Sequence, residues 1–152
     1  MKALLTGITG NLGYEVYLDL IKRGINVVPC VRPGRTDILS SYPAKFDQVV
    51  ECDLTDREGG DINLSEEVDC IVHCAGVVHF NIAEDKNQQM MLRVVKLATK
   101  LKIPVYAVST AFVYKPLDTS REFNNSYEED KFLAEQILVS SCLLYTSDAA
   151  DE

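Results

Sequence analysis

The sequence lacks any long apolar run, and its positive charges are outnumbered. No stretch approaches the roughly 18 to 20 apolar residues of a membrane-spanning helix, so we expect no membrane span. Lysine and arginine total 15 against 23 aspartates and glutamates, a net charge of −8, which argues against a nucleic-acid-binding surface. The chain also has no repeats and no low-complexity linker, and its 152 residues suffice for one domain with a real core but not for two ordinary ones.

Cysteines are few and scattered. The five of them stand singly, mostly within apolar runs: Cys30, Cys52, Cys70, Cys74 and Cys142. This usage is typical of reduced thiols rather than of a disulfide framework, and we expect a cytoplasmic protein. Cys70, His73 and Cys74 are a conceivable metal site, but they lie in an apolar run whose alternate residues would point to opposite faces of a strand. We therefore interpret this run as a buried strand and expect no metal.

Apolar runs of strand length alternate with stretches of helical periodicity. We expect strands at 3–5, 26–31, 48–52, 68–74 and 104–109, helices at 11–23, 83–101 and 126–140, and a short helical turn at 36–41. The first helix should end where Gly24 takes the C′ position. This alternation predicts an α/β fold, a doubly wound parallel sheet with helices on both faces.

A glycine-rich loop joins the first strand to the first helix. In this loop, TGITGNLG, Gly7 permits a tight turn, Gly10 lets the backbone approach a pyrophosphate, and Gly13 lets the helix pack closely on the strand. The helix N-terminus then presents amides and a positive dipole end to phosphates. The pattern predicts dinucleotide binding by Thr6, Gly7, Thr9, Gly10, Asn11, Leu12 and Gly13.

A tyrosine and a lysine stand four residues apart in the last predicted helix. Tyr127 and Lys131 therefore lie on one face of it. A free phenol exchanges its proton poorly at neutral pH, and a neighbouring ammonium stabilises the phenolate. Together with the glycine loop, this YxxxK spacing predicts an enzyme that uses a nicotinamide cofactor, with Tyr127 as the proton donor.

Over residues 2–140, these motifs resemble the extended branch of the short-chain dehydrogenase/reductase superfamily. The resemblance implies a Rossmann-type sheet that is truncated after the catalytic helix. Asp53 and Leu54 match the motif that follows the third strand, where the aspartate reaches the adenine amino group. The HCAG string matches the motif after the fourth strand, so the backbone around Ala75 and Gly76 should line the cofactor cleft.

The same resemblance assigns the catalytic groups. In this family the lysine also holds the nicotinamide ribose, and a catalytic hydroxyl precedes a Val-Tyr pair by three residues. Counting back from Val113 gives Thr110 rather than Ser109. Thr110 would hold the substrate carbonyl while Tyr127 protonates the developing oxyanion; alternatively, Ser109 and Thr110 merely cap the strand. Asn87 either matches the asparagine that begins the family's central helix or simply starts a helix.

The end of the second predicted strand bears on cofactor choice. An NAD site usually has an acidic residue there to bind the ribose hydroxyls. This chain has Arg32 and Arg35 instead, with no carboxylate before Asp37. A guanidinium can hold a 2′-phosphate with two hydrogen bonds, so we expect NADP, with NAD as the less favoured cofactor. The alternative is that both arginines are solvated loop charges.

Three strings narrow the resemblance to the thioester reductase and fatty acyl-CoA reductase subgroup: IVHCAGVVHF, VSTAFVY and NSYEEDKFLAEQIL. These enzymes reduce a small-molecule or carrier-bound acyl thioester with NADPH. Two features depart from the subgroup, which usually has serine in place of Asp130 and a longer segment at 115–126. The alternatives are a nucleotide-sugar epimerase or dehydratase and a non-catalytic regulator that senses NAD(P). Family members often form homodimers through the central and catalytic helices.

The last eleven residues, CLLYTSDAADE, look foreign to the protein. They resemble the translation of an adapter used in transposase-based DNA library preparation. We therefore expect residues 1–141 to be an incomplete NAD(P)-binding domain, 142–152 to be an artefact, and the C-terminal substrate domain to be missing. We expect such a fragment to be poorly stable and inactive.

Overall fold

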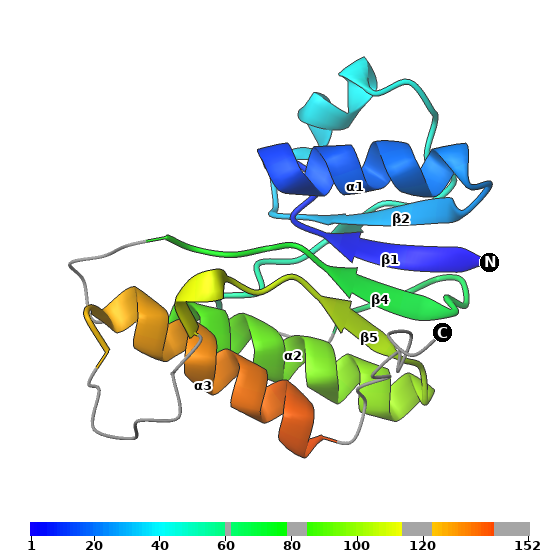
Figure 1. Ribbon diagram of the computed structural model, residues 1–152. Coiled ribbons are helices and arrows are strands. Elements are labelled where there is room, and N and C mark those ends of the chain that lie inside the picture. The colour runs from blue at the N-terminus through cyan, green and yellow to red at the C-terminus, as the bar shows by residue number, and fades with distance from the viewer. Residues whose placement is uncertain (60–61, 79–84, 114–122, 142–152) are drawn as a thin grey trace, which may run out of the picture.

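The computed structural model describes residues 1–59, 62–78, 85–113 and 123–141. Their core is a five-stranded parallel sheet of strand order β3-β2-β1-β4-β5 (Figure 1). The strands are β1 (Lys2–Thr6), β2 (Asn26–Val31), β3 (Val50–Glu51), β4 (Cys70–His73) and β5 (Val105–Ala107). The helices are α1 (Asn11–Lys22), α2 (Lys86–Leu101) and α3 (Ser126–Ser140), with short 3-10 helices η1 (Thr36–Ser41) and η2 (Ala111–Val113).

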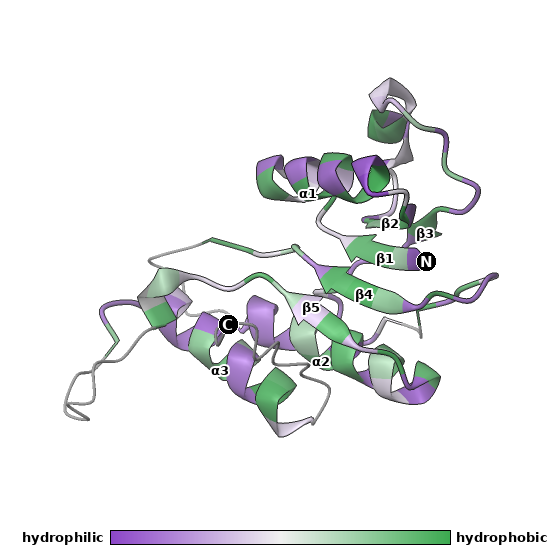
Figure 2. Ribbon diagram, turned by 45° about the vertical axis from the view of Figure 1, so that its right-hand side comes forward, coloured by the Kyte–Doolittle hydropathy of each residue, from purple (hydrophilic) through white to green (hydrophobic). Residues whose placement is uncertain are grey.

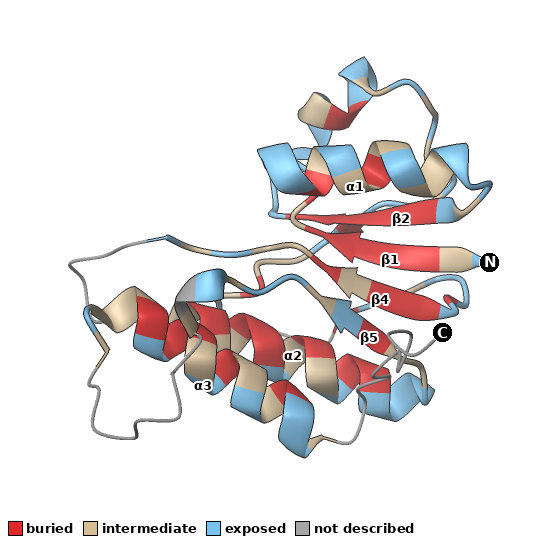
Figure 3. Ribbon diagram, in the orientation of Figure 1, coloured by how far each residue is buried: buried red, intermediate tan, exposed pale blue. Residues whose placement is uncertain are grey.

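Helices cover both faces of this sheet. Helix α1 lies over one face, and α2 and α3 lie side by side against the other (Figure 1). The central strand β1 contributes side chains to the apolar cores on both faces of the sheet, because successive side chains of a strand point to opposite faces. Leu4 packs in the core that includes Val94 of α2, whereas Leu5 packs with Tyr17 of α1. Apolar residues fill the strands, and the buried residues of the helices face the sheet (Figures 2 and 3). The predicted doubly wound α/β fold is confirmed.

Local signals set the ends of the helices. Gly24 follows α1 with a φ of +73°, the left-handed conformation expected for a C′ glycine. At the start of α3, the side chain of Asn125 accepts a hydrogen bond from the backbone N–H of Glu128 at 3.0 Å. The Glu128 carboxylate in turn accepts the N–H of Asn124 at 2.9 Å. This reciprocal cap fixes where the chain enters α3.

The sequence predicted β2, η1 and α3 with the bounds that the structure has, but it overestimated three strands. β3, β4 and β5 are shorter than the apolar runs at 48–52, 68–74 and 104–109. Apolar residues can be buried beyond the hydrogen-bonded ladder, as Val68 is, two residues before β4 begins. The expected start of the second helix, 83–84, and the tail at 142–152 lie outside the described residues. Within the described ranges, no helix is long and apolar enough to cross a membrane.

Candidate functional site

The candidate site lies where the strand order reverses, at the carboxyl ends of β1 and β4. Chain connections leave these two neighbouring strands toward opposite faces, which opens a crevice between them. Thr6 ends β1 and is in register with His73, which ends β4. The Thr6 Oγ1 atom lies 2.7 Å from His73 Nδ1 and accepts the N–H of Ala75 at 3.3 Å. Thr6 thus lies buried beneath the site and links its two walls.

His73 supports the site as a neutral side chain. Burial, and secondarily the positive charge of Lys131, lower the pKa of His73 from 6.5 to about 4. A neutral imidazole can accept a hydrogen bond from the Thr6 hydroxyl at its Nδ1 atom. The Nδ1 atom of His73 therefore has the Thr6 hydroxyl as its partner across the two strands. The described residues contain no group of three or more potential metal ligands.

The glycine loop is packed as tightly as its predicted roles require. Gly7 has a φ of +75°, and a Cβ atom there would lie 2.4 Å from the Ala75 nitrogen. A Cβ on Gly13 would lie 2.0 Å from the Gly7 carbonyl oxygen. Helix α1 can therefore approach the loop this closely only because position 13 has no side chain. A Cβ on Gly10 would meet its nearest neighbour, the Gly7 oxygen, at 3.4 Å. Packing of the protein alone therefore does not require Gly10 to be a glycine.

The start of α1 can receive an anion. Gly10 is its N-cap residue and provides no side-chain hydrogen bond to the first amides. The loop is closed instead by backbone bonds, from the N–H of Gly10 to the Gly7 oxygen and from the N–H of Tyr14 to the Gly10 oxygen, both 2.9 Å. Uncapped amides at a helix N-terminus favour phosphate groups. The residues present therefore fit a dinucleotide pyrophosphate.

A cleft of about 340 Å³ opens beside this loop. It brings together eight of the predicted cofactor residues: Gly7, Thr9, Gly10, Arg32, Asp53, Leu54, Ala75 and Gly76. Asn11 and Leu12 line an adjoining groove with Tyr42. Arg35 is exposed and is not among the residues that line either space. The structure thus gathers most of the predicted residues around one cleft but separates the two loop arginines.

Asp53 is held in place on the far wall of the cleft. Its carboxylate accepts the N–H and the hydroxyl of Thr55 at 2.9 and 2.7 Å. These hydrogen bonds, with the nearby charges of Arg32 and Arg93, lower the pKa of Asp53. Arg93 of α2 also donates to the Asp53 carbonyl oxygen at 2.5 Å and fixes the backbone. Sequence reasoning missed Arg93, because its partner is a main-chain atom 40 residues away.

The predicted catalytic residues lie around the end of β5. The Lys131 ammonium is buried and donates to the carbonyl oxygen of Val108 at 3.2 Å. Burial lowers the pKa of Lys131, an effect that the carboxylates of Glu135 and Asp130 oppose. Tyr127, one turn earlier on α3, is half-buried. Thr110 is also half-buried and begins the turn of η2, whereas Ser109 is exposed.

Asn87 joins the walls of the site. Its side chain accepts the N–H of Val77 at 3.0 Å and donates to the Val77 oxygen at 2.9 Å. It also donates to the Asp130 carboxylate at 2.8 Å. Asn87 therefore does more than start a helix: it ties the loop after β4 to α2 and α3. Two sequence signals bear on this network: the match of Asn87 to the family's helix-starting asparagine, and the departure of Asp130 from the expected serine.

The chain resembles known proteins both in sequence and in structure. A sequence model described as "NAD dependent epimerase/dehydratase family" matches residues 3–150. A comparison with curated proteins gives no significant match. One similar solved structure is a thiolation-reductase di-domain from an archaeal non-ribosomal peptide synthetase, with a TM-score of 0.72 and 21% identity over 94% of this chain and 49% of that one.

Two further solved structures contain NAD+. WbmH from Bordetella bronchiseptica, in complex with NAD+, has a TM-score of 0.66 and 26% identity, covering 93% of this chain and 52% of that one. UDP-glucose 4-epimerase from Bifidobacterium longum, in complex with NAD+ and UDP, has a TM-score of 0.63 and 21% identity, covering 92% and 48%. This chain therefore spans about half the length of the solved structures it resembles.

Proposed function

The chain belongs to the NAD dependent epimerase/dehydratase family, within the extended short-chain dehydrogenases/reductases, and on that premise we propose that it is the cofactor-binding half of an NADPH-dependent reductase of acyl thioesters. The observation that carries this proposal is the position of Lys131. Its buried ammonium donates a hydrogen bond to the carbonyl oxygen of Val108, which precedes Thr110 by two residues. Lys131 itself follows Tyr127 by one turn of α3. The contact of Lys131 with Val108 supports a grouping of the lysine, the phenol and the hydroxyl near the carboxyl end of β5.

In this proposal, the cleft holds the cofactor along its length. The amides at the start of α1 bind the pyrophosphate, Asp53 receives the adenine, and the backbone at Ala75 and Gly76 faces the cofactor. Arg32 lines the cleft and supplies the positive charge that a 2′-phosphate needs, which supports NADPH over NADH. When bound, the nicotinamide supplies a hydride to the carbonyl carbon of the substrate.

In the proposed reaction, the protein's own groups stabilise the negative charge on the carbonyl oxygen and supply the proton. Thr110 and Tyr127 donate hydrogen bonds to the carbonyl oxygen, where negative charge develops. The Lys131 ammonium stabilises the phenolate that remains when Tyr127 gives up its proton. Glu135 and Asp130 help Lys131 to stay charged despite its burial. Cleavage of the carbon–sulfur bond releases a thiol and leaves an aldehyde.

A nucleotide-sugar epimerase or dehydratase is the second candidate. It has support in the family match and in the similarity to UDP-glucose 4-epimerase. The same lysine, phenol and hydroxyl can serve the transient oxidation of a sugar alcohol. The two candidates differ in their use of cofactor: a reductase consumes it stoichiometrically, whereas an epimerase regenerates it within each turnover.

The test measures NADPH consumption and thiol release. Because the similar structures are about twice as long, the protein used is the longest reading frame that contains residues 1–141. We expect absorbance at 340 nm to fall with an acyl-coenzyme A or acyl-carrier thioester, with one free thiol per aldehyde formed. Epimerisation of a UDP-sugar without net NADPH loss would instead establish the second candidate. Cofactor binding without turnover of any of these substrates would indicate the regulator.

A further inference from the structure

Two cysteines lie together on the wall of the candidate cofactor cleft. Cys30 is in β2 and pairs with Val50 of β3, and Cys52 follows β3 with its N–H bonded to the Val31 oxygen at 2.8 Å. Cys52 lies two residues beyond Val50, so both thiols are on the same face of neighbouring strands. Both residues line the 340 Å³ cleft beside Arg32 and Asp53. Cys30 is buried, whereas Cys52 is half-buried and accessible from the cleft.

The two thiols differ in acidity because they interact. Interaction with the neighbouring Cys52 thiol, aided by burial, raises the pKa of Cys30. The same interaction lowers the pKa of Cys52 to about 7. The opposite directions of the two shifts favour Cys52, the more exposed of the two, as the thiolate of the pair.

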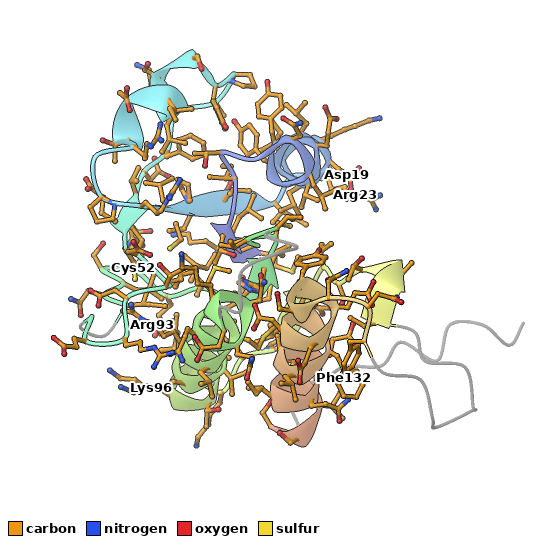
Figure 4. All side chains as sticks on the ribbon, turned by 90° about the vertical axis from the view of Figure 1, so that its left-hand side faces the viewer. Asp19, Arg23, Cys52, Arg93, Lys96 and Phe132 are labelled. Carbon is orange, nitrogen blue, oxygen red and sulfur yellow. The ribbon has the colours of Figure 1, made fainter. Side chains whose placement is uncertain are left out.

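Charged groups from two other elements face Cys52. Arg93 of α2 favours the Cys52 thiolate, whereas Asp53 and Asp56, in the loop after β3, oppose it. Arg93 is held against this loop by hydrogen bonds to the carbonyl oxygens of Asp53 and Asp56, at 2.5 and 3.1 Å. Figure 4 shows Cys52 and Arg93 on the same side of the molecule, at the loop that follows β3. A positive charge beside a partly exposed thiol is the environment of a reactive cysteine.

We propose that Cys52 is a thiol–disulfide exchange site, at which low-molecular-weight disulfides such as glutathione disulfide modify the wall of the cleft. In this reaction the Cys52 thiolate attacks one sulfur of the disulfide. The sulfur–sulfur bond of the reagent breaks, a mixed disulfide forms on Cys52, and the second half leaves as a thiolate. The disulfide is the oxidant, and Cys30 acts as the hydrogen-bond donor that keeps Cys52 reactive.

Modification at this point has a consequence for the cofactor. Cys52 precedes Asp53, the residue to which the proposed function assigns the adenine, and this part of the inference rests on that proposal. A glutathionyl group on Cys52 would fill the cleft beside Asp53. The mixed disulfide and the dinucleotide should therefore exclude one another, and reduction by a free thiol should restore cofactor binding.

The test compares the reaction rates of the individual cysteines with glutathione disulfide at pH 7, resolved by peptide mass spectrometry. It uses the same protein as the activity test, the longest reading frame that contains residues 1–141. Cys74, half-buried in the same cleft, is the internal reference, since burial raises its pKa above the ordinary value of 9.0. At pH 7, the thiolate fraction of a thiol with a pKa of 7 is about 50 times that of a thiol with a pKa of 9. The thiolate of the more acidic thiol is, however, about tenfold less nucleophilic, which leaves a net advantage of about fivefold.

We therefore expect Cys52 to react at least about fivefold faster than Cys74 in the native chain, with the difference abolished in urea. Cys30→Ala should slow Cys52, whereas Cys30→Ser, which keeps a donor, should preserve its rate. Cys70→Ala removes a buried cysteine that does not line the cleft and should have no effect. Equal rates for Cys52 and Cys74 in the native chain would overturn the proposal, as would an unchanged Cys52 rate in both Cys30 variants.

Adding NADP+ separates this inference from the proposed function. Protection of Cys52 by NADP+ supports both. Fast reaction of Cys52 in a chain that binds no NADP+ supports the thiol site and counts against the proposed cofactor. Bound NADP+ that gives Cys52 no protection would overturn the mutual exclusion of glutathione and cofactor.

Discussion

The carboxylate of Asp130 caps helix α2 from the neighbouring helix α3. Its Oδ2 atom accepts the backbone N–H of Asn87 at 2.9 Å, and its Oδ1 atom accepts that of Gln88 at 3.1 Å. These are the second and third residues of α2, whose amides an N-cap side chain normally satisfies. Asp85, the residue that precedes α2, makes no such bond. Asp130 also adjoins Lys131, so one buried carboxylate links the start of α2 to the segment of α3 that carries Lys131.

Replacing Asp130 with asparagine should destabilise the fold. Each oxygen of this carboxylate accepts two hydrogen bonds, and an amide would turn its NH2 group toward two donors. Leaving buried donors unpaired costs about 1–3 kcal/mol. We expect urea unfolding of D130N to show a free energy of unfolding lower by about 2 kcal/mol. Glu129→Gln, at the exposed neighbouring position, should unfold like the wild type; equal stability of D130N would contradict the capping role.

Sequence patterns predicted the elements of the fold better than the contacts of its site. The glycine spacing and the run of alternating elements depend on local geometry, so Gly7, Gly13 and the bounds of α3 could be anticipated. The Asp130 cap joins residues 43 positions apart, and no local pattern encodes it. A sequence shows which side chains can accept hydrogen bonds, but only packing of α3 against α2 decides which amides they meet.

The same limit applies to the two loop arginines. Both lie within four residues of the end of β2, and their residue type suggested one shared role. The turn between them, with the Arg35 N–H bonded to the Arg32 oxygen at 3.1 Å, leaves only Arg32 lining the cleft. The Cys30–Cys52 pair could not be predicted from the sequence either, because it arises from the pairing of β2 with β3.

His73 should make the stability of the protein depend on pH below 6.5. The folded protein keeps His73 neutral, with its pKa lowered from 6.5 to about 4, whereas the unfolded chain binds a proton near 6.5. The stabilisation is therefore complete above pH 6.5 and is lost as the pH falls toward 4, by about 1.4 kcal/mol per pH unit and about 3 kcal/mol in all.

The measurement is the free energy of unfolding between pH 4.5 and 7. His73→Asn can retain an acceptor for the Thr6 hydroxyl and should flatten the pH dependence relative to the wild type. Parallel slopes for the wild type and H73N would show that His73 does not remain neutral in the folded protein.

Alanine at Gly13 and at Gly10 should have different effects. A Cβ on Gly13 would overlap the Gly7 carbonyl at 2.0 Å, so G13A should lose stability, by about 2 kcal/mol or more, together with cofactor binding. A Cβ on Gly10 has a nearest contact of 3.4 Å, so G10A should unfold within about 1 kcal/mol of the wild type.

In the proposed function, however, the added methyl group of G10A occupies space that the pyrophosphate needs. We expect G10A to bind NADPH at least about tenfold more weakly, a loss of about 1.4 kcal/mol, in a fluorescence titration. Unchanged affinity in a folded G10A protein would place the phosphates elsewhere. Gly24→Ala, at a positive φ far from the cleft, provides a control for general strain.

Arg32 should determine the preference for NADPH. A guanidinium bonded to a phosphate contributes about 1.5–3 kcal/mol, so R32A should weaken NADPH binding about tenfold or more while NADH binding changes little. Arg35→Ala, which removes the same charge outside the cleft lining, is the matched control and should have a smaller effect. Titration of both variants with both cofactors decides the matter. An equal loss of NADPH affinity in the two variants would indicate general attraction by the loop instead of a phosphate contact.

Thr110 and Ser109 provide a test of the catalytic assignment. Thr110 is half-buried and directly precedes η2, whereas Ser109 is exposed, so the proposed function assigns the substrate carbonyl to Thr110. Loss of one oxyanion donor costs about 100- to 1000-fold in kcat. Thr110→Val keeps the shape of the side chain without its hydroxyl and should show such a loss in the NADPH oxidation assay, whereas Ser109→Ala should stay within a few-fold of the wild type. Because both variants should bind NADPH normally, the loss can be assigned to chemistry, and the reverse order of the two activities would move the catalytic hydroxyl to Ser109.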